Sequence, residues 1–233
     1  MEPVFDLASV DADGAIRESE QHVAADTRAT FFRKAAVGGG AVLGSTAFLG
    51  MLPELAMGKP SKKQDLAILN YALTLEYLEA AFYNTAITNG KGFSNEAMTF
   101  AETVALHENT HVTALKKTIK SLGGKPVASP TFDFKGTTDK EDTFLATALV
   151  LENTGVHAYL GQAGRLQSKA LLGAAASILT VEARHASAAA ILVYGKDAYG
   201  TSKESISPDG SFDTPLSKKQ ILAAVGETGF ITG

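Results

Sequence analysis

The chain has 233 residues, 45% of them hydrophobic, which is enough for a packed core in one or two domains. Its net charge of -4 comes from 21 basic and 25 acidic residues without a basic cluster beyond short lysine pairs, which argues against nucleic acid as a partner. Cysteine is absent, so disulfides, thiolate metal ligands and cysteine nucleophiles are excluded.

The N-terminal segment, residues 1–58, is predicted to lie outside the folded domain. Residues 1–27 are polar and acidic without a periodic apolar face, which predicts disorder. Positive residues between 28 and 34 precede an apolar run at 35–52, which is the layout of an export signal. We therefore expect export to the periplasm or cell envelope. The alternatives are a cytoplasmic protein and a membrane anchor through residues 35–52, although the glycines make this run a weak membrane helix.

Four long helices are predicted within residues 59–196, because apolar residues recur there every three or four positions. Serine, asparagine and glycine mark the ends of these helices as caps and breakers. The expected helices run from 62 to 88, from 94 to the glycines at 123–124, from 139 to the glycines at 161–164, and from 168 to 194.

The connections between the predicted helices differ in length. The first and third are short, so helices one and two, and helices three and four, should form antiparallel hairpins. The middle connection, residues 125–138, contains two prolines and a glycine and cannot be helical. It can extend about 46 Å, whereas a helix of about 27 residues is about 40 Å long. This predicts an all-α four-helix bundle with a long crossover between helices two and three.

The C-terminal extension, residues 197–233, is predicted to be a polar loop followed by a short helix over 216–225. Ser217 and Gln220 have the spacing of a capping box at the start of that helix. We expect the extension to pack on the bundle or to take part in contacts between copies of a homo-oligomer.

Each of the four predicted helices has an apolar stripe that is interrupted near its middle by acidic or imidazole side chains. Helices one and three carry a lone glutamate there, and helices two and four carry a Glu-x-x-His pair. A buried carboxylate is too costly to keep ionised without a partner, and lysine and arginine are absent from these stripes. Metal cations are therefore the expected counter-ions. The candidate ligands are Glu76, Glu108, His111, Glu152, Glu182 and His185.

The positions of these six residues predict a single site for two metal ions. Each of the four candidate glutamates lies about 15 residues from its hairpin turn, so all four should sit about 23 Å from the turns, at one level of the bundle. Four carboxylates balance the charge of two divalent ions. Oxygen-rich ligation with one nitrogen per metal favours iron or manganese over a structural zinc. One Glu-x-x-His pair alone would mean little, but two in core stripes are a much stronger signal.

Other polar residues near the predicted site have weaker assignments. Tyr83 and Tyr159 follow the lone glutamates by seven residues and should either donate hydrogen bonds to ligating carboxylates or simply fill the core. Glu79 lies one turn after the first lone glutamate and could replace it as a ligand, but we expect a solvated or rim position. His107, which should point away from the neighbouring ligands, and His157 are expected to be surface or rim residues rather than ligands.

The helical part of the chain resembles the ferritin-like superfamily, in particular bacterial ferritin-like domain proteins that carry twin-arginine signals and are related to desiccation-associated proteins. The resemblance covers about residues 62–195, and the segment from Thr27 resembles the signal, with Ala29 where the second arginine belongs. The ligand order is similar to that of bacterioferritin, which implies the same six ligands and supporting roles for both tyrosines. The stretches that carry the resemblance are ALTLEYLEAAFY, ALHENTHVTAL, LVLENTGVHAYLGQ and LTVEARHASAAA.

The resemblance implies a ferritin-like bundle with a di-iron or di-manganese centre, and we expect iron rather than manganese. Our leading functional hypothesis is a protein that oxidises Fe(II) or reacts with O2 or peroxide. One alternative is a peroxide dismutase similar to manganese catalase. The other is a non-enzymatic stress or envelope protein with a structural or vestigial metal site. Fold alone does not choose among these activities.

Overall fold

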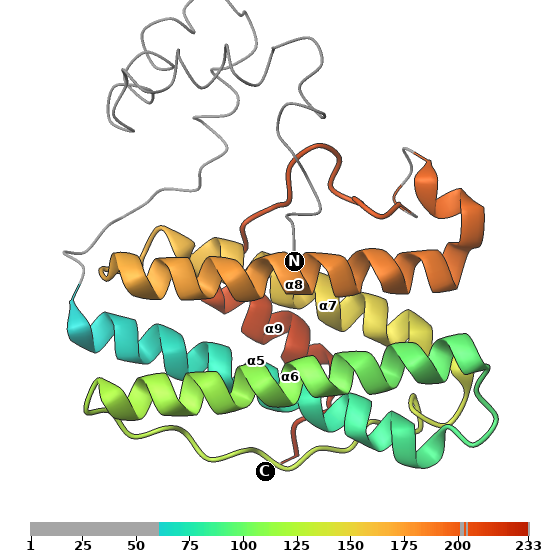
Figure 1. Ribbon diagram of the computed structural model, residues 1–233, viewed down its shortest axis with the longest axis horizontal. Helices are drawn as coiled ribbons and strands as arrows, with labels where there is room; N and C mark the ends of the chain where they lie inside the picture. The colour runs from blue at the N-terminus through green and yellow to red at the C-terminus, as the bar shows by residue number, and fades with distance from the viewer. Residues whose placement is uncertain (1–60, 201–202, 204, 233) are drawn as a thin grey trace, which may run out of the picture. The chain divides into compact units, whose positions relative to one another are not determined.

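The structure is a computed structural model that describes residues 61–200, 203 and 205–232, all of which belong to the compact unit Glu54–Gly233. The predicted export segment lies outside the described residues. Four long helices form the body of the described chain (Figure 1). They are α5 (Lys62–Asn89), α6 (Asn95–Ser121), α7 (Glu141–Ala163) and α8 (Lys169–Tyr194).

The ends of these helices have local causes that the sequence also shows. Ser61, Ser94 and Ser168 cap α5, α6 and α8, and each side chain accepts a hydrogen bond from the backbone N–H three residues later. Gly90 ends α5, where its N–H donates to the carbonyl of Ala86. Each helix therefore begins and ends within two residues of its predicted position.

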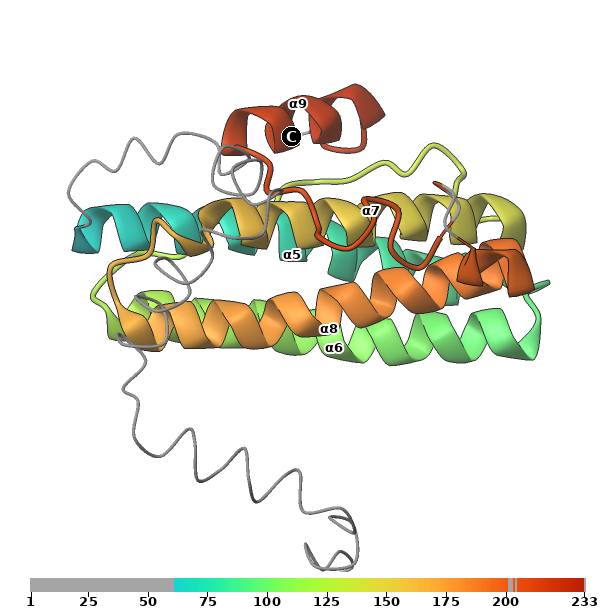
Figure 2. The ribbon, with the colours of Figure 1, turned by 90° about the horizontal axis from the view of Figure 1, so that it is seen from above.

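The four helices form two hairpins that pack face to face. Helix α5 pairs with α6 and α7 pairs with α8, and the hairpins meet through contacts of α5 with α7 and of α6 with α8 (Figures 1 and 2). The crossover from α6 to α7 runs along the side of the bundle (Figure 1). It places Phe134 in the core and forms an isolated antiparallel bridge between Phe132 and Ile231. The all-α bundle with a long crossover between helices two and three is thus confirmed.

The core is divided into two apolar clusters. One cluster contains aromatic side chains such as Phe82 and Phe144, and the other is mostly aliphatic and contains Leu73 and Ile119. Each large apolar side chain that is fully buried stabilises the fold by roughly 1.5–3 kcal/mol. The clusters lie toward opposite ends of the bundle. Their apolar burial can therefore offset the free-energy cost of burying a polar layer between them.

The C-terminal extension packs on α7. Its short helix, α9 (Lys218–Thr228), begins at the predicted capping box of Ser217 and Gln220 and buries Ile221 and Val225. The segment before α9 approaches α7 closely at Gly161, where a Cβ atom would lie 1.8 Å from the carbonyl oxygen of Leu216. Glycine is therefore required at this contact.

Helix α8 is the most apolar of the long helices. Together with the short 3-10 helix η2 (Gly195–Tyr199), it is the one helix of the described residues that is long and apolar enough to cross a membrane by length and composition. Core helices of soluble proteins meet the same criterion, and α8 contributes buried charged side chains to the bundle. Its outer face exposes Leu172 and Ile191.

Candidate metal centre

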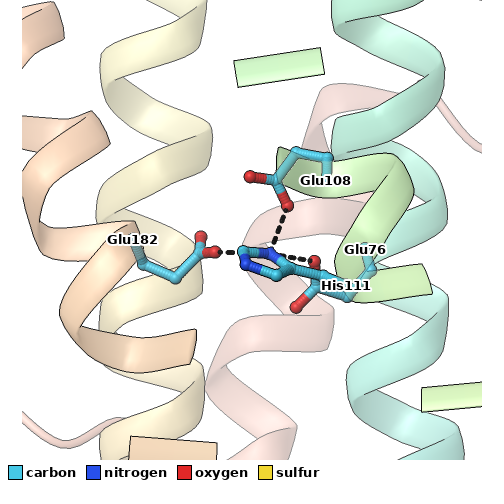
Figure 3. A group of neighbouring side chains, drawn as sticks. All are labelled: Glu76, Glu108, His111 and Glu182. Atoms are coloured by element: carbon cyan, nitrogen blue, oxygen red, sulfur yellow. Dashed lines mark hydrogen bonds and ion pairs between the residues drawn. The ribbon is translucent and has the colours of Figure 1, made fainter. Parts of the chain in front are cut away.

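The four long helices bring all six predicted ligands into one layer between the two apolar clusters. The four glutamates are fully buried, and His111 and His185 are 9% and 5% exposed. Figure 3 shows Glu76, Glu108, His111 and Glu182 pointing toward one another from three different helices. Burial of this many ionisable groups in one layer calls for strong compensating interactions.

The six side chains form two overlapping groups whose ligand atoms lie within 4.8 Å of one another. Two residues, Glu108 and Glu182, belong to both groups and are therefore placed to bridge two ions. The first group is Glu76, Glu108, His111 and Glu182, and the second is Glu108, Glu152, Glu182 and His185.

A single nitrogen of His111 faces three carboxylates. Its Nδ1 atom lies 3.0 Å from Glu108 Oε2, 3.2 Å from Glu76 Oε2 and 3.4 Å from Glu182 Oε1 (Figure 3). One imidazole nitrogen carries either one proton or one lone pair, so it cannot satisfy three acceptors. Ligands bound at about 2.1 Å in octahedral geometry are about 3.0 Å from their neighbours. The observed spacing is close to that of donors around one cation.

His185 repeats this arrangement in the second group. Its Nδ1 atom lies 3.1 Å from Glu152 Oε2 and 3.2 Å from Glu108 Oε1. The Oε2 atom of Glu182 is buried and makes neither a hydrogen bond nor an ion pair with any described residue. An orphaned carboxylate oxygen of this kind is expensive unless a cation meets it. Thus this set of donor atoms is better suited to binding two cations than to forming a metal-free hydrogen-bond network.

Burial and the hydrogen bonds between histidines and carboxylates act in opposite directions on the pKa values of the metal-free centre. Burial raises the pKa of Glu76 to about 8 and that of Glu182 well above its usual range. Burial also opposes ionisation of Glu108, but hydrogen bonds from His111 and His185 outweigh it and lower the pKa of Glu108 to about 2. In return, carboxylate hydrogen bonds overcome the desolvation of His111 and raise its pKa to about 12. Without metal, these raised pKa values favour the protonated forms of Glu76, Glu182 and His111 near neutral pH.

Each of the two lone glutamates accepts a hydrogen bond from a tyrosine of the other hairpin. The hydroxyl of Tyr83 on α5 donates to Glu152 Oε1 on α7 at 2.5 Å. The hydroxyl of Tyr159 on α7 donates to Glu76 Oε1 on α5. Each bond leaves the other oxygen of the glutamate free to face a histidine, so the tyrosines orient the carboxylates.

The prediction of a solvated or rim position for Glu79 was wrong. This side chain is only 3% exposed and lies on the same face of α5 as Glu76, one turn later. Burial, together with the negative charges of Glu182 and Glu152, keeps its pKa well above the usual range. Its burial depends on Gly155 of α7, because this glycine has no side chain to occupy the same space. The sequence of α5 alone therefore does not show that Glu79 is buried.

His107 is half-buried and belongs to neither ligand group, as expected for a rim residue, but its ring contacts a ligand of the centre, which was not predicted. Its Nδ1 atom lies 2.9 Å from Nε2 of His185, and the two rings are nearly parallel, with centroids 5.1 Å apart. The contact arises because α6 and α8 are neighbours across the two hairpins. The other uncertain histidine, His157, is half-buried and lies 3.2 Å from Asp209, outside both ligand groups.

Comparison with protein families agrees with this architecture. Residues 64–195, more than half of the chain, match the profile described as Ferritin-like domain. The chain therefore belongs to the family of ferritin-like domain proteins. A comparison with curated proteins finds no match. The family and the buried glutamates and histidines together show a centre that could hold metal ions.

Proposed function

We propose that the centre holds two divalent metal ions, iron in preference to manganese, and that the protein oxidises Fe(II) or reacts with O2 or peroxide. The observation that carries the proposal is the approach of each histidine Nδ1 to two or three carboxylate oxygens at 3.0–3.4 Å in a buried layer. Iron bound there would supply the electrons that reduce the oxidant.

The residues of the chain have distinct tasks in this proposal. Glu76 and His111 would hold one ion and Glu152 and His185 the other, as the two ligand groups suggest. The two shared carboxylates would bridge the ions. If Nδ1 of a neutral His185 held the ion, its Nε2–H would donate a hydrogen bond to Nδ1 of His107, which would orient the ring.

An apolar cavity supports O2 as one of the oxidants. It has a volume of about 60 Å³ and lies at the aliphatic end of the bundle, between side chains such as Leu69, Leu115 and Ile178. Tyr159 also lines it, and the hydroxyl of this tyrosine contacts Glu76 of the centre. A cavity of this size and polarity suits a small apolar molecule.

The first test is metal content and reactivity of the natively purified protein. We expect two ions per chain and accelerated loss of Fe(II) in the presence of O2 or peroxide. The Glu108→Gln variant, which keeps the size of the side chain but removes a bridging charge, should lose at least one ion. Glu102→Gln, an exposed position on the same helix, is the matched control and should keep both.

The outcomes separate the candidate functions. Loss of peroxide with bound manganese and no Fe(II) oxidation would favour the dismutase. Bound metal without either reaction would favour a structural role. If the native protein bound neither Fe(II) nor Mn(II), or if Glu108→Gln left metal content unchanged, the proposed centre would be wrong.

We also propose that the protein acts outside the cytoplasm. The support is the order of positive residues, apolar run and proline between residues 28 and 53. Cell fractionation with sequencing of the mature N-terminus should find a processed protein in the envelope fraction. An intact chain in the cytosol would contradict export.

A further inference from the structure

The two hairpins are repeats of one another, and the repeat is broken beside the metal centre. The lone glutamates are 76 residues apart in the sequence, and so are the two tyrosines that contact them. The same offset of 76 residues pairs Glu79 of α5 with Gly155 of α7. One half of the molecule thus carries a fifth carboxylate where the other half carries no side chain.

Glu79 and Gly155 are complementary in space as well as in sequence. A Cβ atom added to Gly155 would lie 3.1 Å from Oε1 of Glu79 and 2.6 Å from Oε2 of Glu182. Both oxygens therefore occupy the region that a side chain on α7 would fill. The glycine provides the room in which these two carboxylates approach each other.

On the side that faces Gly155, these carboxylates lack the partners that buried charges require within the described residues. Glu79 is 3% exposed and makes no hydrogen bond or ion pair with any described residue. Oε2 of Glu182 is equally unpartnered within the described residues. Two such groups cannot both remain ionised without a cation.

The geometry also assigns this pair of oxygens to one of the two metal positions. The Oε1 atom of Glu182 faces His111, which belongs to the first ligand group. Its Oε2 atom is turned toward Gly155, which follows Glu152 of the second group by one turn of α7. The carboxylates that most raise the pKa of Glu79 are Glu182 and then Glu152, in agreement with this side of the centre.

We propose that Glu79 is a seventh donor, which binds only the ion held by Glu152 and His185 and so makes the two metal positions inequivalent. This inference rests on the proposed two-metal function. The fifth carboxylate brings the ligand charge to -5, which two divalent ions do not neutralise but one divalent and one trivalent ion do. Glu79 should therefore strengthen binding at its own position and favour the trivalent state there.

The test is a titration of the metal-free protein with Mn(II). Calorimetry and the electron paramagnetic resonance signal of the bound ions monitor the binding. The native chain should bind two ions in two steps of different affinity. In Glu79→Gln the tighter step should weaken about 10- to 100-fold while the other step is unchanged. The reduction potential of the first one-electron step of the iron-loaded protein should also rise.

Gly155→Ala tests the same pocket without removing a ligand. Its new methyl group would displace Oε2 of Glu182, so it should weaken the same step. Gly173→Ala on α8 is the matched control, because a Cβ atom there has no neighbour within 4 Å in the described part of the chain, and it should leave both steps unchanged. Circular dichroism of each variant reports whether the bundle has folded.

The inference and the proposed function fail in different ways. If the native protein binds no Mn(II), both are wrong. If the native protein and Glu79→Gln bind two ions with the same pair of affinities, Glu79 is not a donor, although the two-metal centre stands. Equal weakening of both steps would also overturn the assignment, since it would show a general structural role.

Discussion

At the scale of single residues, the crossed tyrosine bonds couple each lone glutamate to the opposite hairpin. The hydroxyl of Tyr159 contacts Glu76, and that of Tyr83 contacts Glu152. A hydrogen bond to one oxygen of a ligating carboxylate fixes which oxygen remains for the metal. The tyrosine on one helix should therefore control metal binding on another helix.

Replacing each tyrosine by phenylalanine tests this coupling. Tyr159→Phe should weaken binding at the position of Glu76 by about tenfold, and Tyr83→Phe should do the same at the position of Glu152. Competition titrations with Mn(II) measure both affinities. Tyr77→Phe is the control, because among the described residues its hydroxyl donates a hydrogen bond only to a backbone carbonyl of the crossover, at 3.4 Å. If each variant weakened the position on its own helix instead, the crossed arrangement would be wrong.

The sequence predicts the six converging residues better than it predicts their surroundings. Their convergence could be foreseen because it depends on periodicity and on equal distance from the turns, which are both local properties. The burial of Glu79 could not, since it depends on a missing side chain on α7. The contact of His107 likewise depends on which helix of the other hairpin lies beside α6.

At the scale of elements, the helix boundaries could be predicted because serine caps and glycine breakers act within one turn of the chain. Packing of the C-terminal segment on the bundle was one of two expectations, but the place where it docks could not be predicted from the sequence. It is determined by Gly161, which permits the close approach of Leu216 to α7. This contact is remote in sequence and carries no periodic signal.

Gly161→Ala should therefore loosen the docking of α9. We expect the free energy of unfolding to fall by about 1–3 kcal/mol, because the new methyl group would overlap the backbone of Leu216. Urea unfolding measures the change, and metal content should remain that of the native protein. Gly173→Ala, with open space around it, should be neutral or slightly stabilising. Equal stability of the two variants would show that the contact is not required.

At the scale of the whole molecule, the charged layer makes stability depend on pH in opposite directions with and without metal. The pKa of Glu76 is raised from 4.5 to about 8 in the folded chain. Its contribution to stability is therefore present below pH 4.5 and is lost as pH rises toward 8. Glu108, with its pKa lowered to about 2, has the opposite effect, but only between pH 4.5 and 2.

Metal ions replace the protons of this layer, so their binding should strengthen as pH rises. We expect the metal-free protein to lose thermal stability from pH 5 to pH 8 and the stabilisation by Mn(II) to grow over the same range. An ion present at about 100 times its dissociation constant contributes about 2.7 kcal/mol per site. Thermal unfolding with Mn(II) and with a chelator at both pH values measures the difference. A metal effect that is constant with pH, or as large in Glu108→Gln as in the native protein, would contradict the coupling.

The broken repeat has a consequence for the origin of such a chain. A homodimer of one hairpin could supply the same six donors and crossed tyrosines by twofold symmetry, since every one of these residues has a counterpart in the other half. Such a dimer would have to carry the same side chain at positions 79 and 155. Duplication within one gene removes that constraint. A single chain can place a glutamate at one position and a glycine at the other, and two equivalent halves can then acquire different tasks.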